Sequence, residues 1–166
     1  MQFAIDIETL DVRPTAVICS VAAVSLEEPK IVFYRKLDWT QQTNREVSLD
    51  TIRWSLSQPE QSRQEFLGGE FSLESTLKDL RAFLENHWAT DVWQWGTMDA
   101  DVLNHAARQC FGDAPHDVYA VYYRWVRDAR TLFAVNGWDK PVASVEHTAL
   151  EDAQALASSL RTHLNL

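Results

Sequence analysis

Cysteine and long apolar runs are scarce in this sequence, and both absences exclude classes of protein. Cys19 and Cys110 are its two cysteines, which are too few for a disulfide framework and lack the spacing of a zinc site. No apolar run approaches the roughly 18 residues that a membrane helix needs, so we expect no membrane partner. The first residues carry neither the basic region nor the cleavage site of a signal peptide. These absences predict a reducing, cytoplasmic compartment.

Basic residues are also few, and two well-known catalytic motifs are missing. Lys and Arg total 15 against 24 Asp and Glu, which gives a formal charge of −9. A general nucleic-acid coat would be basic, whereas a carboxylate site is acidic until two divalent ions cancel about four of its charges. The sequence has no Walker loop and no nucleophile elbow, which argues against ATP-driven work and against a serine hydrolase.

The pattern of apolar residues predicts one α/β domain that covers residues 1–166. Three strands come first, and their short connections favour an antiparallel meander. Mostly helices follow, with one short strand among them, so we expect a sheet that is covered by helices. The expected strands are residues 2–7, 16–24, 30–37 and 91–95, and the expected helices are residues 48–58, 72–88, 99–111, 126–135 and 149–164.

Asp6 and Glu8 form the first of three acidic stretches. Residues two apart in a strand point to the same face, so the two carboxylates should project together while Ile5 and Ile7 point the other way. Two carboxylates on one face repel each other unless a cation lies between them. A solvated strand end is the ordinary alternative, and this fragment alone does not exclude it.

The second and third stretches each place an acidic residue near the start of a helix. A strand runs into a tight turn at Gly96, and Asp99 follows, where an ordinary helix N-cap is the alternative interpretation. Farther along, Thr148 to Glu151 fit a capping box. His147 would then lie just before the helix and be free to approach Asp152, although a histidine in that place is usually a surface residue.

In this order, the three stretches resemble the motifs of the DnaQ-like DEDDh 3′–5′ exonucleases. Residues 51–54 and 127–132 are similar to small exoribonuclease-like and phage-type exodeoxyribonuclease members. The resemblance covers residues 3–164 and rests on residues 6–9, 96–103 and 147–152. Asp99 and Asp101 both lie near the second-motif position. Val102 and Leu103 stand third and fourth after Asp99, as the family pattern requires, so Asp99 is preferred. The resemblance implies a ribonuclease H-like mixed sheet flanked by helices.

The same resemblance implies a metal-dependent enzyme that hydrolyses phosphodiester bonds. Asp6, Glu8, Asp99 and Asp152 would hold two divalent cations, Mg²⁺ or Mn²⁺, because these ions prefer hard oxygen ligands. Two such ions stabilise the attacking and the leaving oxygen of the reaction. His147 would be the general base, since an unperturbed imidazole titrates near pH 6.5 and can accept a proton at neutral pH.

Substrate contacts are expected beside the first motif and on the helix over residues 48–58. The resemblance places Thr9 and Leu10 at the substrate, with Leu10 against a terminal base. Trp54 falls about 140° from Leu49 around that helix, on the far side of the expected apolar stripe, where it would stack on a base. The alternative is that Trp54 packs under residues 59–70. The expected apolar stripe is Leu49, Ile52 and Leu56.

The expected partner is the 3′ end of a single strand, with RNA favoured over DNA. A nucleic-acid-binding module without turnover is the alternative from another class of protein, although all five site residues are present. Arg124, Arg127 and Arg130 recur every three residues and would form either a basic strip for phosphates or a solvated helix face. A homodimer is a further expectation, because dimers are common among proteins of this type.

Overall fold

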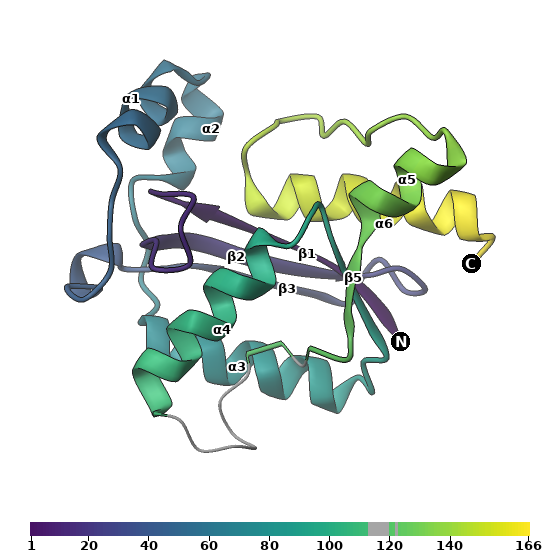
Figure 1. The fold of residues 1–166 in the computed structure, drawn as a ribbon, viewed down its shortest axis with the longest axis horizontal. Coiled ribbons are helices and arrows are strands. Elements are labelled where there is room, and N and C mark those ends of the chain that lie inside the picture. The colour runs from purple at the N-terminus through teal and green to yellow at the C-terminus, as the bar shows by residue number, and fades with distance from the viewer. Residues whose placement is uncertain (113–119, 122) are drawn as a thin grey trace.

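A five-stranded sheet forms the centre of the molecule in a computed structural model that describes residues 1–112, 120–121 and 123–166 (Figure 1). Strands β1 to β3 form the expected antiparallel meander, whereas β4 runs parallel to β1 and β5 parallel to β4. The sheet is therefore mixed, as expected for a ribonuclease H-like fold. The strands, in the spatial order β3-β2-β1-β4-β5, are β1 (Gln2–Thr9), β2 (Ile18–Ser25), β3 (Val32–Lys36), β4 (Asp91–Gln94) and β5 (Val126–Asp128).

Helices cover both faces of the sheet (Figure 1). One face packs against α3 (Leu73–Asn86) and α4 (Met98–Phe111), and the other against α5 (Ala129–Asn136) and α6 (Ala149–Leu164). A shorter pair, α1 (Leu49–Ser57) and α2 (Glu60–Glu65), lies beside the N-terminal end of α6. A 3₁₀ turn, η1 (Trp39–Gln41), precedes this pair. None of the described helices is long and apolar enough to cross a membrane.

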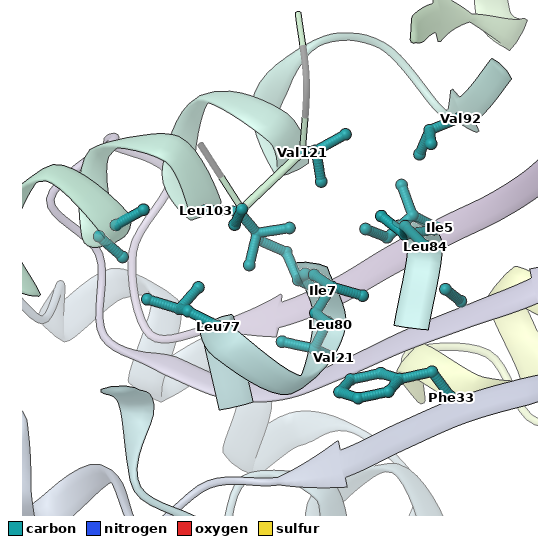
Figure 2. Packing of buried hydrophobic residues seen from close by; sticks show 14 of the residues in the cluster. Ile5, Ile7, Val21, Phe33, Leu77, Leu80, Leu84, Val92, Leu103 and Val121 are labelled. Atoms are coloured by element: carbon teal, nitrogen blue, oxygen red, sulfur yellow. The ribbon is translucent and has the colours of Figure 1, made fainter. Parts of the chain in front are cut away.

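The side chains of β1 divide the hydrophobic core into two layers. Ile5 and Ile7 are buried on the side of α3 and α4, and Figure 2 shows them packed with Leu80, Leu84 and neighbouring apolar residues. Each large aliphatic side chain buried in this way stabilises the fold by about 1.5–3 kcal/mol. Small residues lie on both sides of the contact between the sheet and α6 and let that helix lie close to the sheet. They are Ala4 and Ala22 in the sheet and Ala149, Ala153 and Ala157 in α6.

The helix expected over residues 126–135 is wrong in its first part, whereas most other elements begin and end within two residues of their expected positions. Val126–Asp128 pairs with β4 as the edge strand β5, and helix α5 begins only at Ala129. The N–H of Val92 donates to the carbonyl of Trp125 at 2.7 Å. Long-range pairing of this kind overrides a local helical pattern, because the sheet satisfies backbone groups that the helix would have used.

The α1–α2 pair differs from expectation in two ways. Pro59 ends α1 as expected, but it also stands at the N-cap of α2, a helix that periodicity did not indicate. The expected apolar stripe of α1 is wrong, because Leu49 and Leu56 are 78% and 67% exposed while Ser55 is buried. The helix lies at the edge of the domain and packs through Ile52 on a small cluster that contains Leu10, Val17, Cys19 and Phe66.

Candidate active site

Strand β1 carries two carboxylates on the face of the sheet that α6 covers. Asp6 and Glu8 alternate with Ile5 and Ile7, which are buried in the opposite layer, so the expected alternation is confirmed. Asp6 lies beside Ala22 of β2 in the strand register. A methyl group at that position leaves room above the sheet for polar groups from other elements.

Asp99 reaches the same place from the first turn of α4. It is 7% exposed, whereas Asp101 is exposed on the outer side of the helix, so the buried carboxylate is the one that the apolar pattern favoured. Asp99 is not the N-cap, because the helix begins at Met98 after Thr97. The Thr97 side chain makes no cap hydrogen bond.

The start of α4 is fixed by two residues of the preceding strand and turn. The side-chain oxygen of Gln94, which is buried, accepts a hydrogen bond from the N–H of Ala100 at 2.8 Å. Gly96 has a φ of 97°, a conformation that favours glycine, and its N–H donates to Asp128 Oδ1 at 3.1 Å. The tight turn expected at Gly96 is therefore confirmed.

The turn of residues 146–149, which leads into α6, brings His147 and Asp152 together. The N–H groups of His147 and Thr148 both donate to Asp152 Oδ2, at 2.8 and 3.2 Å. His147 has a φ of 64°, which lies in the left-handed region that few non-glycine residues adopt. The turn thus places the imidazole outside the helix, next to the carboxylate in its first turns.

The capping box expected at the start of α6 is wrong, although Thr148 is the N-cap. Thr148 Oγ1 donates to the carbonyl of Val145 at 3.2 Å instead of accepting from the helix. Glu151 accepts a hydrogen bond from Ser144 Oγ and so does not reach back to the N-cap. Asp152 takes over one part of the box, because its carboxylate accepts the N–H of Thr148 that Glu151 would have bound, and it also accepts the N–H of His147.

One cavity of about 220 Å³ collects all five predicted catalytic side chains. They come from β1, from α4 and from the start of α6, so residues far apart in the sequence converge on it. Trp95 and Lys140 contribute an aromatic and a cationic side chain to its wall. The lining residues are Asp6, Ile7, Glu8, Trp95, Met98, Asp99, Lys140, Pro141, Glu146, His147, Asp152 and Leu156.

The carboxyl groups in this cavity hold their protons more tightly than isolated ones. Desolvation raises the pKa of Asp6 and of Glu8 well above their ordinary values, and the neighbouring carboxylates raise both further. Burial raises the pKa of Asp99 to about 7. The pKa of Asp152 is also raised by burial, but the N–H of His147 and the charge of Lys140 act against this rise. Closely spaced acids without a cation produce this pattern.

The donor atoms of the site fit a divalent cation. Ligand atoms of Glu8, His147 and Asp152 all lie within 4.8 Å of one another. Asp6 and Asp99 fall outside this group of three but line the same cavity. Among the described residues, none of the four carboxylates has a Lys or Arg partner within ion-pair distance. Buried carboxylates without such a partner, and with oxygen donors this close, suit Mg²⁺ or Mn²⁺.

Trp54 lies next to His147. Its ring centroid is 4.6 Å from that of His147 in an edge-to-face arrangement, and 6.4 Å from that of Phe66. The indole is 41% exposed. Trp54 therefore contacts both His147 and the segment that follows α2, and stacking of its ring on a base stays a prediction.

Thr9 and Leu10, the other expected substrate contacts, are both buried. Thr9 Oγ1 donates to the carbonyl of Asp11 at 2.6 Å. Leu10 is 6% exposed and packs against Val17, Cys19 and Phe66. Leu10 also lines a second, mainly apolar groove between α1 and α2. Contact between Leu10 and a base stays a prediction.

The three arginines do not form a strip on one helix. Arg127 lies in β5, where Nη2 pairs with Asp91 Oδ1 at 2.7 Å. Arg130 lies in α5 and donates to the carbonyl of Trp95 at 3.4 Å. The guanidinium of Arg124 lies 5.6 Å from the ring centre of Tyr123. Their regular spacing in the sequence is interrupted by the change from strand to helix.

Two residues near the cavity were not found by sequence reasoning. Glu65 is buried at the end of α2, and its charge raises the pKa of both Asp6 and Glu8. Lys140 lines the cavity from an exposed loop. Neither residue belongs to a motif. The sequence gives only one sign of Glu65, namely that this acidic residue directly precedes the apolar pair Phe66 and Leu67.

Comparisons with known proteins agree with this geometry. A family model described as the 3′–5′ exoribonuclease Rv2179c-like domain matches residues 1–164. No curated protein matches the sequence significantly.

Two solved nuclease structures are similar to the chain. The crystal structure of cell-death related nuclease 4 (CRN-4) has a TM-score of 0.52 and 10% identity over 99% of this chain and 63% of that chain. The structure of E. coli Exonuclease I in complex with a 5cy-dT13 oligonucleotide has a TM-score of 0.49 and 16% identity over 99% of this chain and 41% of that one. The chain thus spans less than two thirds of either structure, and the likeness to CRN-4 supports a shared fold.

Proposed function

Because this chain belongs to the family of 3′–5′ exoribonuclease Rv2179c-like domains, we propose that it is a metal-dependent exonuclease that removes nucleotides one at a time from the 3′ end of single-stranded RNA. The observation that carries the proposal is the convergence of four carboxylates and one histidine on a single cavity. These residue types in this arrangement provide the ligands and the proton acceptor that hydrolysis of a phosphodiester requires.

Asp6, Glu8, Asp99 and Asp152 would hold two Mg²⁺ or Mn²⁺ ions. When bound, such ions stabilise the negative charge that develops on the attacking and the leaving oxygen. Asp6 and Glu8 are fixed by the central strand, and Asp152 is held through two backbone N–H groups. The protein therefore presents its ligands on rigid elements, which limits reorganisation when the substrate arrives.

His147 would accept the proton of the attacking water as the new O–P bond forms. The bond between the phosphorus and the 3′ oxygen of the preceding nucleotide then breaks, and a nucleoside 5′-monophosphate leaves. The shortened strand retains a 3′-hydroxyl after its oxygen takes a proton from solvent. The position of His147 at the cavity wall, beside Glu8 and Asp152, supports this role.

Trp54, Thr9 and Leu10 would bind the last bases of the strand. The Trp54 indole contacts His147 and is partly exposed, and stacking on an aromatic ring holds a base without regard to sequence. RNA is favoured over DNA because the family is described by exoribonuclease activity.

A homodimer in the cytoplasm stays a prediction. Light scattering on the purified protein measures the mass of the particle and so tests whether it is a dimer.

The first test uses 5′-labelled single-stranded RNA and DNA of one sequence, incubated with the protein and Mn²⁺ or EDTA. We expect a ladder of products shortened from the 3′ end that requires the metal and is faster on RNA. Asp6→Ala is the matched inactive variant, and Asp101→Ala, which changes an exposed carboxylate outside the cavity, is the active control. A faster ladder on DNA would reassign the substrate, and no ladder on either strand would refute the proposal.

A further inference from the structure

Helix α2 holds both ends of the turn that carries His147. Ser62 Oγ donates to the carbonyl of Glu146 at 2.7 Å, and Glu65 Oε1 accepts a hydrogen bond from the N–H of Ala149 at 3.3 Å. Ser62 and Glu65 are 1% and 5% exposed, so water does not compete for either bond. One short helix therefore fixes the backbone immediately before and after the residues His147 and Thr148.

Glu65 is itself held in place from the sheet. The hydroxyl of Tyr34 in β3 donates to its two carboxylate oxygens, at 2.9 and 3.1 Å. Tyr34 lies beside Ala22 of β2, which in turn lies beside Asp6 of β1. The small Ala22 leaves space above the sheet in this row. The carboxylate of Glu65 thus connects the sheet to the first turn of α6. Glu65 itself belongs to none of the three acidic motifs.

The backbone of His147 needs such support. A non-glycine residue with a φ of 64° is strained, and it persists only where the surrounding structure determines its conformation. The adjoining N–H groups are bound by Asp152, and the imidazole packs edge to face with Trp54 of α1. The contacts from α2 add two further restraints on this turn.

From these contacts we propose that Ser62 and Glu65 are positioning residues for the general base: they hold the 146–149 turn so that the imidazole of His147 faces the carboxylates of the cavity. The inference rests on the proposed function of His147. Neither residue lines the cavity, so we expect their hydrogen bonds to act on the reaction through His147. The charge of Glu65 also acts on Asp6 and Glu8, and Glu65→Gln separates that effect from the hydrogen bonds.

Matched variants separate a hydrogen-bond role of Glu65 from a charge role. Glu65→Gln keeps an oxygen that accepts from Ala149 and Tyr34 but removes the charge, whereas Glu65→Ala removes both. Ser62→Ala removes only the bond to Glu146. Gln61→Ala, on the exposed side of α2, is the control for changes in this helix that should have no effect.

We expect Ser62→Ala and Glu65→Ala to lower kcat by about 10- to 100-fold, because a misplacement of about 1 Å costs up to about 10²-fold. KM should change little, and Glu65→Gln should retain most of the wild-type rate. Combined with His147→Asn, the two alanine changes should cause no further loss, because the residue through which they act is already gone. The proposal would be overturned if the alanine changes lowered kcat equally in the wild type and in His147→Asn. A Glu65→Gln variant as slow as Glu65→Ala would also overturn it.

The His147 ring resonance in an NMR spectrum tests the positioning without any turnover. The ring current of Trp54 should displace this resonance in the wild type, and the His147→Asn variant identifies it by its disappearance. Ser62→Ala and Glu65→Ala should move it toward the value of a free imidazole, and an unmoved resonance in Ser62→Ala would refute the inference even if Glu65→Ala fails to fold. If the wild type cuts neither RNA nor DNA, the proposed function fails, and this resonance alone decides the positioning.

Discussion

His147 combines an imidazole at the cavity with a left-handed backbone. Asparagine tolerates that backbone better than most residues, so His147→Asn removes the proton acceptor with little strain. We expect kcat to fall by about 10²- to 10⁴-fold, which is the usual contribution of a general base. The melting temperature should stay close to that of the wild type.

Steady-state rates and a thermal melt of the same preparation measure this prediction. His163→Asn, a change at the far end of α6, controls for the loss of a histidine as such. A His147→Asn enzyme with the wild-type rate would remove His147 as the base. A large fall in Mn²⁺ affinity, with little change in the rate at saturating metal, would instead identify it as a ligand.

Asp99 links the stability of the metal-free protein to pH. Burial raises its pKa to about 7 from an ordinary 3.8, so the folded protein binds this proton more tightly than the unfolded chain does. The group costs no stability below about pH 4, where both states are protonated, and it lowers stability progressively as the pH rises to about 7. Bound metal should remove this penalty, because a nearby cation favours the ionised carboxylate.

We therefore expect the melting temperature of the wild type in EDTA to fall as the pH rises over this range. The melting temperature of Asp99→Asn should fall less steeply. Mn²⁺ should raise the melting temperature of the wild type more at neutral pH than in acid. Melts of both proteins across pH, each with EDTA and with Mn²⁺, measure all of these effects. Parallel curves for the two proteins in EDTA would contradict the prediction.

Trp54 presents part of its ring to solvent at the edge of the cavity. Stacking on a base contributes about 1–3 kcal/mol, so Trp54→Ala should raise KM by roughly 5- to 150-fold. Trp54→Phe should recover much of the affinity because it keeps an aromatic face. Rates on an RNA oligonucleotide at several concentrations give this comparison, and an unchanged KM in Trp54→Ala would leave the ring as a packing residue only.

The turn at Gly96 connects the strand β4 to the helix that carries Asp99. A Cβ atom added at Gly96 would lie 2.8 Å from Arg130 Nη2, and the φ of 97° is unfavourable for other residues. We expect Gly96→Ala to lower the free energy of unfolding by about 1–3 kcal/mol and to weaken Mn²⁺ binding, because Asp99 moves with the turn.

Urea unfolding and Mn²⁺ titration of Gly96→Ala test this expectation. Gly137→Ala is a useful comparison, because Gly137 also has a positive φ, of 68°, but no atom lies within 4 Å of its added Cβ. Both variants should lose stability, and only Gly96→Ala should lose metal affinity. Equal Mn²⁺ affinities in the two variants would show that the turn at Gly96 does not affect metal binding at the site.

Most elements could be predicted because their residues carry local signals. Ser48 and Ser72, for example, cap α1 and α3 through their side chains. Strand β5 could not be found in this way, because its three residues become a strand only through pairing with β4. Helix α2 is also short, with six residues, and its contacts with the 146–149 turn join residues that are distant in sequence.

The five residues that line the cavity could be picked out because the order and spacing of the three motifs resemble those of a known family, and their catalytic roles stay predictions. Glu65 could not, because it reaches the site from an element that carries no motif. Its role depends on Tyr34 and Ala149, which tertiary structure alone brings to it. Residues that support a site in this way are set by how the individual chain packs, so no motif in the sequence marks them.

The molecule as a whole carries a formal charge of −9, which repels a nucleic-acid strand. We expect binding of RNA to depend on divalent metal, since the ions neutralise the carboxylates of the cavity and attract the phosphate. Fluorescence anisotropy of a labelled RNA with His147→Asn should show tight binding with Mg²⁺ and much weaker binding in EDTA. Equal affinity in both buffers would show that a surface outside the cavity holds the strand.

The candidate site draws Asp6 from β1 and Asp152 from α6, so the chain must be made at least through Asp152 before the cavity has all of its acidic groups. During translation the strand that carries Asp6 and Glu8 emerges well before the segment that supplies His147 and Asp152. A nascent chain that stops before this segment lacks two of the five groups. Under the proposed function, such a nascent chain would have no nuclease activity.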